Sequence, residues 1–431
     1  MVLCVTASAF GSGQEIEKLA RDFVLLMSKE EYRKGVVSFD SNMRKVAPPD
    51  KLKEIWSSQL AKTGAHQEIT GTRIEHLGQY RAVFVTCRFA NAQLDMKIVF
   101  DKADKIAGLF FVPTIVQYRP PNYAKPKTFK EMDAQIGNGE WVLPGTLTVP
   151  KGEGRFPAVI LVHGSGPQDR DESIGPNKPF RDLAWGFASQ GIVVLRYEKR
   201  TRQYAARLAD GTDGLTVREE TIADASEAVS LLLENEAVRA DRIFVLGHSL
   251  GGMLIPRIGQ SRPAVAGFVM MAANARPLED LVLEQTLFQS SLKGELSDQE
   301  KTNVAEIKEQ VAAVKALSAG NTSGPLILGA PRSYWLDLEG YSPIEAAKEI
   351  QRPILIVQGE KDCQVSSKKD FQEWRRVLSD SNNVEFRLYP MLNHLFMQVD
   401  GESTGAEYYQ LGNVDEAVVR EIADWIKRHE D

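Results

Sequence analysis

The chain of 431 residues is 43% hydrophobic and 26% charged, which is the composition of a globular protein of two or three domains. Its formal net charge of −6 gives no overall attraction for nucleic acid or anionic lipid. No apolar run reaches the roughly 18 residues that a membrane span requires. The three cysteines and six histidines show no spacing typical of a disulfide framework or a metal site. We therefore expect no metal and no cofactor.

The first residues leave two compartments open. Residues 1–9 combine a short apolar stretch with an A-x-A arrangement, but they have no basic segment. If they are the remnant of a signal peptide, the protein is secreted or periplasmic. If they are an ordinary terminus, it is cytoplasmic.

The N-terminal quarter predicts a small α+β domain over residues 1–118. Apolar side chains recur at helical spacing within residues 14–62. Three strands are then expected, at residues 81–89, 94–101 and 106–112.

A proline-containing linker follows this domain. Residues 113–130 contain four prolines and no clear period, which is typical of a connecting segment. We assign its central part, residues 119–130, as the boundary between domains.

Strands and helices then alternate to the end of the chain. Strands are expected at residues 131–137, 141–149, 157–163, 191–197, 242–248, 265–272, 353–359 and 384–389. Helices are expected between them, at residues 180–190, 217–236, 250–260, 366–379 and 413–429. Several strands are continuous apolar runs, as in a sheet covered on both faces. The pattern predicts an α/β fold with a mostly parallel, doubly wound sheet.

One interval is too long to be a simple crossover between strands. Residues 277–345 hold two helical stretches, 278–292 and 297–318, followed by a loop with glycine and proline. We interpret this interval as a helical cap. It divides the predicted α/β domain into residues 131–276 and 346–431.

Ser249 is the candidate nucleophile. The expected strand 242–248 runs into Gly-His-Ser-Leu-Gly at residues 247–251, and a helix follows. G-x-S-x-G between a strand and a helix is typical of a nucleophile elbow. The pattern also occurs at residues 401–405, but no strand leads into it, so we interpret Ser403 as an ordinary loop serine.

A serine hydroxyl needs a histidine base that is oriented by a carboxylate. Of the two histidines after Ser249, His394 follows the last expected strand, whereas His429 lies near the C-terminus and is expected on the solvated surface. Asp362, after the strand 353–359, is the preferred acid. Glu360 in the same loop and Asp280 after the strand 265–272 are its competitors.

Two backbone N–H groups are needed to stabilise the oxyanion. One is expected from Leu250, at the helix start. The other is expected from Ser165, in the small-residue loop after the strand 157–163, with Gly166 as the alternative. His163 and the side chain of Ser165 are also expected to hold the shape of that loop.

Two groups of charged residues follow the early strands. Arg170 lies in the run Q-D-R-D-E at residues 168–172, and Arg196, Lys199 and Arg200 follow the strand 191–197. They can meet an acidic group on a substrate or pair within their own loops, and we prefer internal pairing.

Residues 131–431 resemble the α/β-hydrolases. The motifs H-G-S-G-P-Q-D-R-D-E at residues 163–172, G-H-S-L-G-G at 247–252 and G-E-K-D-C-Q-V at 359–365 resemble the serine esterase branch. That branch lies near dienelactone hydrolases, prolyl oligopeptidases and acyl-CoA thioesterases. The resemblance implies the same triad and oxyanion donors as the residue pattern. Dienelactone hydrolases proper use a cysteine nucleophile, so a serine at position 249 argues against that activity.

The N-terminal domain is similar to the cone-shaped fold of nuclear-transport-factor-two type. In that case it helps to form a homodimer or walls the pocket, although a structural appendage is the interpretation we favour.

The sequence thus predicts a carboxylesterase for small or short-chain acyl esters, with a small-molecule partner and neither nucleic acid nor a transmembrane segment. An acyl-CoA thioesterase or a peptidase could use the same triad. The alternative from another class is a ligand-binding protein with a vestigial hydrolase site.

Overall fold

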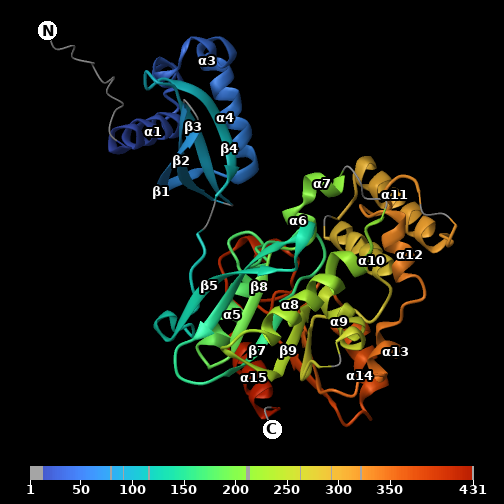
Figure 1. The fold of residues 1–431 in the computed structure, drawn as a ribbon. Helices are drawn as coiled ribbons and strands as arrows, with labels where there is room; N and C mark the ends of the chain where they lie inside the picture. The colour runs from blue at the N-terminus through green and yellow to red at the C-terminus, as the bar shows by residue number, and fades with distance from the viewer. Residues whose placement is uncertain are drawn as a thin grey trace. The chain divides into compact units, whose positions relative to one another are not determined.

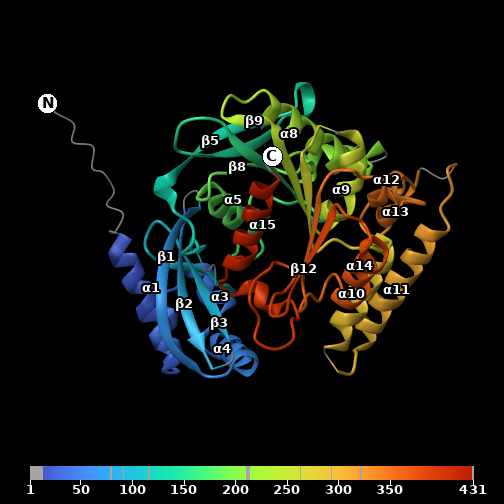
Figure 2. The same ribbon diagram turned by 90° about the horizontal axis from the view of Figure 1, so that it is seen from below.

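The computed structural model (Figures 1 and 2) describes residues 13–429, apart from 78–79, 91, 115–116, 210–213, 263, 293 and 321–322. The alternative interpretations of residues 1–9 lie outside the described residues. The chain divides into two compact units, Met1–Val116 and Gln117–Asp431. Among the described residues, no helix is long and apolar enough to span a bilayer.

The N-terminal unit is a four-stranded antiparallel sheet with helices packed on one face. The strands run in the order β1 (His66–Leu77), β2 (Tyr80–Phe89), β3 (Gln93–Phe100) and β4 (Ile106–Pro113). The helices are α1 (Gly13–Ser28), α2 (Tyr32–Gly35), η1 (Val36–Ser38), α3 (Ser41–Val46) and α4 (Pro49–Thr63). Phe23 of α1 and Trp56 of α4 are buried with Val83, Val85 and Phe100 of the sheet.

Strand β1 is absent from the elements expected from the sequence. It is an edge strand, and its residues are half-buried or exposed along its whole length. A polar edge strand therefore lacks the apolar alternation that marked the other three.

The C-terminal unit contains an eight-stranded sheet in the order β12-β11-β10-β9-β7-β8-β6-β5. Six neighbouring strands, from β12 to β8, pair in parallel, and β6 and β5 pair antiparallel at one edge. The strands are β5 (Phe129–Ile136), β6 (Leu143–Pro150), β7 (Phe156–Val162), β8 (Val193–Tyr197), β9 (Val238–His248), β10 (Gly267–Met271), β11 (Ile354–Gly359) and β12 (Val384–Tyr389). This is the mostly parallel, doubly wound sheet that the sequence predicts.

Helices cover both faces of this sheet. Helices α5 (Pro179–Ala188) and α15 (Glu416–Arg428) share one buried cluster with the strands, and α8 (Ala223–Leu233), α9 (Leu250–Ser261) and α14 (Gln372–Leu378) share the other. Successive side chains of β7 alternate between the two clusters. Val159 and Leu161 pack in the cluster with α5 and α15, and Ile160 and Val162 pack in the cluster with α8 and α9. A strand buried on both sides must be apolar at every position, which explains its unbroken hydrophobic run.

In the part of it that the structure describes, the long interval between β10 and β11 contains four helices. They are α10 (Leu278–Ser291), α11 (Asp298–Lys315), α12 (Arg332–Leu338) and α13 (Pro343–Lys348). Helices α10 and α11 pack against each other, as Figures 1 and 2 show. Ser297 caps α11 in a capping box with Glu300, which stops the helix from extending further towards α10.

The remaining elements are short connections. They are η2 (Pro126–Thr128), η3 (Gly139–Trp141), α6 (Arg200–Gln203), α7 (Ala205–Ala209), η5 (Arg218–Ile222), η6 (Ser367–Phe371) and η7 (Ala406–Tyr409).

Candidate active site

Ser249 lies in a strained turn between β9 and α9. Its φ and ψ are 53° and −117°, a region that a residue with a side chain occupies only where the surroundings impose it. Glycines make the turn fit. A Cβ on Gly247 would lie 2.3 Å from the carbonyl oxygen of Gly251, and one on Gly251 would lie 2.4 Å from that of Val162. The structure therefore has the strand–turn–helix geometry that the motif predicts.

Asp362 and His394 form a buried pair. Asp362 follows β11, and His394 lies in the loop after β12. The Nδ1 atom of His394 lies 2.7 Å from Oδ2 of Asp362. The side chain of Gln358 donates to Oδ2 at 2.8 Å, and the backbone N–H groups of Gln364 and Val365 donate to Oδ1 at 2.8 and 2.9 Å. The carboxylate is therefore held in one orientation.

The histidine loop is tied to the serine turn through His248, the residue before Ser249. Nε2 of His248 donates to the carbonyl oxygen of His394 at 3.0 Å, and the two rings lie 4.7 Å apart. The structure thus brings Ser249, Asp362 and His394 to the same end of the parallel sheet.

Of the two expected oxyanion donors, Leu250 follows Ser249 in the chain, and Ser165 follows Gly164, which lies against the serine. Leu250 is the first residue of α9, where a backbone N–H has no acceptor within the helix. Gly164 lies against the serine, because a Cβ there would be 3.1 Å from Cβ of Ser249. Ser165 is the next residue in the chain after Gly164.

Glu172 is a buried residue of this region whose role the sequence did not reveal. Its Oε1 accepts the backbone N–H of Gly164 at 2.7 Å, and its Oε2 forms an ion pair with Nδ1 of His248 at 3.0 Å. Burial alone would raise the pKa of Glu172 and lower that of His248. The attraction between the two groups outweighs burial, so the pKa of Glu172 is lowered and that of His248 is raised.

The competing candidates have other partners. Ser403 is buried and donates to Glu407 and, at 3.3 Å, to the sulfur of Cys363. His429 is half-buried against Trp425 instead of fully solvated. Asp280 pairs with Lys315, and Glu360 is exposed.

The charged residues pair with groups of the protein, but their partners lie in other segments and not, as we preferred, within their own loops. Arg170 donates to Glu198 and Thr146, both at 2.8 Å. Arg196 is buried in ion pairs with Asp171 and Glu131.

An apolar chamber of about 410 Å³ lies beside the candidate oxyanion loop. It is walled by that loop, by the segment between β8 and η5, and by helices of the long interval. Its lining residues are Ser165, Gly166, Pro167, Thr201, Ala205, Leu208, Leu215, Glu220, Leu278, Val282, Leu326, Leu328, Gly329, Ala330, Pro331, Tyr334 and Trp335.

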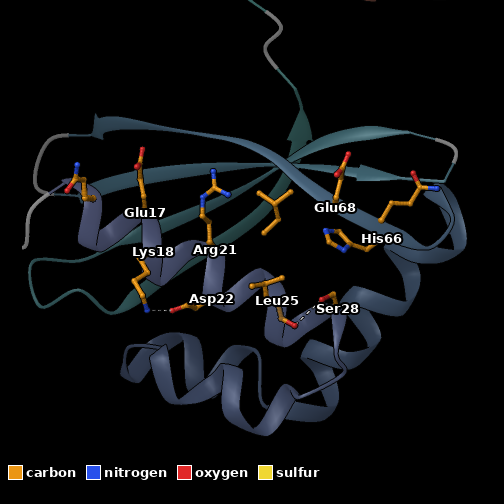
Figure 3. A pocket seen from close by; sticks show the side chains of 11 residues that line it. Glu17, Lys18, Arg21, Asp22, Leu25, Ser28, His66 and Glu68 are labelled. Atoms are coloured by element: carbon orange, nitrogen blue, oxygen red, sulfur yellow. Dashed lines mark hydrogen bonds and ion pairs between the residues drawn. The ribbon is translucent and has the colours of Figure 1, made fainter.

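The N-terminal unit has a hollow of its own, of about 700 Å³, between α1 and the start of β1 (Figure 3). Ser28 and His66 both line it, but the Ser28 hydroxyl donates to the carbonyl oxygen of Leu25 at 2.9 Å. The His66 ring packs against Trp56 and Phe89. The hollow therefore lacks the serine–histidine contact of a nucleophilic site. Within the described parts of the chain, no group of three His, Cys, Asp or Glu residues is arranged to hold a metal ion.

Comparison with known proteins shows the family of this chain. Residues 158–400 match the family model described as serine aminopeptidase, S33. The chain belongs to this S33 family. Across nearly its whole length it is similar to esterase EstD of Thermotoga maritima, with 38% identity over 405 residues, which cover 94% of this chain and 93% of that protein.

Two more distant relatives of this S33 protein are similar over a smaller part of the chain. The uncharacterized peptidase YtmA of Bacillus subtilis is 23% identical over 66% of this chain and 88% of its own. The acylamino-acid-releasing enzyme of Rattus norvegicus is 22% identical over 59% of this chain, which corresponds to 30% of that enzyme. Residues 20–109 match the model of a protein of unknown function, DUF3887, which fits the nuclear-transport-factor-two-like resemblance of this unit.

The packing of the serine turn predicts a steric effect. We expect Gly251→Ala to lower the free energy of unfolding by about 2–3 kcal/mol, because the new Cβ would meet two backbone oxygens within 2.7 Å. Urea denaturation measures the change. Gly320→Ala is the control, since a Cβ there meets nothing within 4 Å. Equal stability of the two variants would contradict this packing.

His163 predicts a pH effect on stability. Burial lowers its pKa to about 4, against about 6.5 in an unfolded chain. Its contribution is therefore complete above pH 6.5 and is lost as the pH falls towards 4. We expect His163→Phe, which keeps a ring beside Phe180 and Tyr197, to reduce this fall by up to about 3 kcal/mol. Denaturation at pH 4.5 and pH 7 measures it, and an unchanged pH dependence would refute the assignment.

Proposed function

We propose that this protein is a carboxylic-ester hydrolase in which Ser249 is the nucleophile, His394 the base and Asp362 the orienting acid. The observation that carries the proposal is the buried Asp362–His394 pair, 2.7 Å apart, whose histidine backbone is hydrogen-bonded by His248, the residue before a serine in a strained turn. The similarity to an esterase over almost the whole chain supports the same activity.

The geometry suggests how the reaction proceeds. Because Nδ1 of His394 faces Asp362, Nε2 is the ring atom left to accept the Ser249 proton. The serine oxygen attacks the ester carbonyl, and the N–H groups of Leu250 and Ser165 stabilise the oxyanion. His394 then gives the proton to the leaving alcohol. Water attacks the acyl-serine with the same base, which releases the acid and restores the hydroxyl.

The chamber beside Ser165 supports a preference for small or short-chain acyl esters. Its walls are largely aliphatic and aromatic, and its volume is about 410 Å³. Burial of an acyl chain there contributes about 0.8 kcal/mol per methylene group, up to the length at which the chain fills the chamber.

The same triad can act on thioesters and peptides. A peptidase is the second candidate function, because the similar protein YtmA is described as a peptidase. Recognition of a free N-terminal amine would require an unpaired carboxylate in the chamber. Glu220 lines the chamber, but it already pairs with Lys199 at 3.1 Å, which favours a neutral ester. Hydrolysis of an aminoacyl p-nitroanilide faster than of p-nitrophenyl butyrate would favour the peptidase instead.

The ligand-binding alternative and the homodimer are both testable on the full chain. A vestigial hydrolase site would leave no Ser249-dependent turnover.

Analytical ultracentrifugation of the full chain reports whether two copies associate.

Loss of the nucleophile is the direct test. We expect Ser249→Ala to reduce kcat on p-nitrophenyl butyrate by about 10³- to 10⁶-fold. Ser403→Ala is a matched control, because it removes the serine of the other G-x-S-x-G pattern and should keep kcat within a few-fold. If both variants are as active as the wild type, Ser249 is not the nucleophile.

Filling the chamber tests the substrate size. We expect the wild type to hydrolyse acetate and butyrate esters faster than octanoate esters. Val282 of α10 lines the chamber, so Val282→Phe should lower kcat/KM for butyrate about tenfold and for acetate much less. Leu287→Phe, at an exposed site of the same helix, should leave kcat/KM unchanged for both butyrate and acetate. A wild-type maximum at octanoate would overturn the short-chain preference.

A further inference from the structure

Lys199 is a buried cation that contacts the candidate oxyanion loop directly. It follows β8 by two residues, and its side chain is 2% exposed. Its Nζ donates to the carbonyl oxygen of Gly164 at 2.7 Å and pairs with Oε1 of Glu220 at 3.1 Å. A buried ammonium group that donates a hydrogen bond to a loop carbonyl fixes the position of that carbonyl.

That carbonyl belongs to the same peptide unit as the N–H of Ser165. The described peptide bonds include no cis bond, and in a trans peptide the C=O and N–H point in opposite directions. With the Gly164 oxygen held by Lys199, the Ser165 N–H must point away from the lysine. The preceding peptide unit is fixed as well, because Glu172 accepts the N–H of Gly164.

The lysine is itself anchored on several sides. The hydroxyl of Tyr334, on α12, donates to Glu220 at 3.0 Å. The backbone N–H of Lys199 donates to the carbonyl oxygen of Gln168, in the same loop as Ser165, at 3.1 Å. Ser165, Glu220 and Tyr334 all line the chamber. The lysine therefore links the chamber wall to the peptide unit beside Ser249.

We infer that Lys199 is a positioning residue for oxyanion stabilisation, which holds the Gly164–Ser165 peptide unit so that its N–H faces the developing oxyanion. The inference rests on the proposed esterase function. The hydrogen bond from the ammonium also polarises the amide, which makes the Ser165 N–H a stronger donor. The effect belongs to the transition state, because the ester carbonyl gains its negative charge only there.

The experiment compares Lys199→Met with the double variant Lys199→Met/Glu220→Gln. The double variant leaves no buried carboxylate without its cation, which is the main reason why the single variant could fail to fold. Arg200→Met is the matched control. It removes the neighbouring half-buried cation, which pairs with Asp224 and not with the oxyanion loop.

Three quantities are measured on variants that are folded by circular dichroism: kcat and KM for p-nitrophenyl butyrate, and the Ki of a butyl trifluoromethyl ketone. The ketone forms a tetrahedral oxyanion on the serine and so requires the oxyanion donors. For the Lys199 variants we expect kcat to fall and Ki to rise, each by about 10²-fold, while KM stays within about threefold. Arg200→Met should keep all three within about threefold.

Two outcomes would overturn the inference. One is a folded double variant whose kcat and Ki match those of Arg200→Met. The other is a fall in kcat with an unchanged Ki, since a misplaced oxyanion donor must weaken both. Ser249→Ala in the same assay separates this result from failure of the proposed function: turnover that survives this change refutes the esterase mechanism itself, whatever Lys199 does.

Discussion

The close approach of backbone at the serine turn is the constraint on which the rest of the site depends. The carbonyl oxygens of Val162 and His163, at the end of β7, lie where a side chain on Gly251 would begin. Helix α9 can therefore start directly beside the end of β7, and the loop after β7 passes next to Ser249. The strained backbone of Ser249 is tolerated because these neighbours leave it no other path.

Buried charge pairs then set the shape of the loop around Gly164. Glu172 holds its N–H and Lys199 holds its carbonyl oxygen. Each of these charged side chains has a buried partner: His248 faces Glu172, and Glu220 pairs with Lys199. Pairs of this kind add little net stability over apolar residues, but removal of one member is strongly destabilising. They specify one arrangement of the loop, which is what preorganised hydrogen-bond donors need.

The helices between β10 and β11 connect substrate size to the same loop. Leu278 and Val282 of α10 form part of the chamber wall, and Tyr334 of α12 contacts Glu220. A single insertion therefore contributes both the apolar surface for an acyl group and the anchor of the lysine. Substitutions in this insertion can change chain-length preference and turnover together, although none of its residues belongs to the Ser249, Asp362 and His394 set.

The sequence by itself determined the doubly wound sheet and the candidates Ser249, Asp362 and His394. The spacing of apolar residues in strands and helices is a local pattern of the sequence. The serine turn likewise needs glycines at fixed positions on either side of the serine. Only the tertiary structure decided what surrounds them. Strand β1 is held by its pairing with β2 instead of by an apolar pattern of its own. In the sequence, Glu172 and Lys199 are only members of two charged groups for which we preferred pairing within their own loops. Their roles arise because distant segments bury them against Gly164. A charged residue carries no local signal of its burial, since its partners lie elsewhere in the chain.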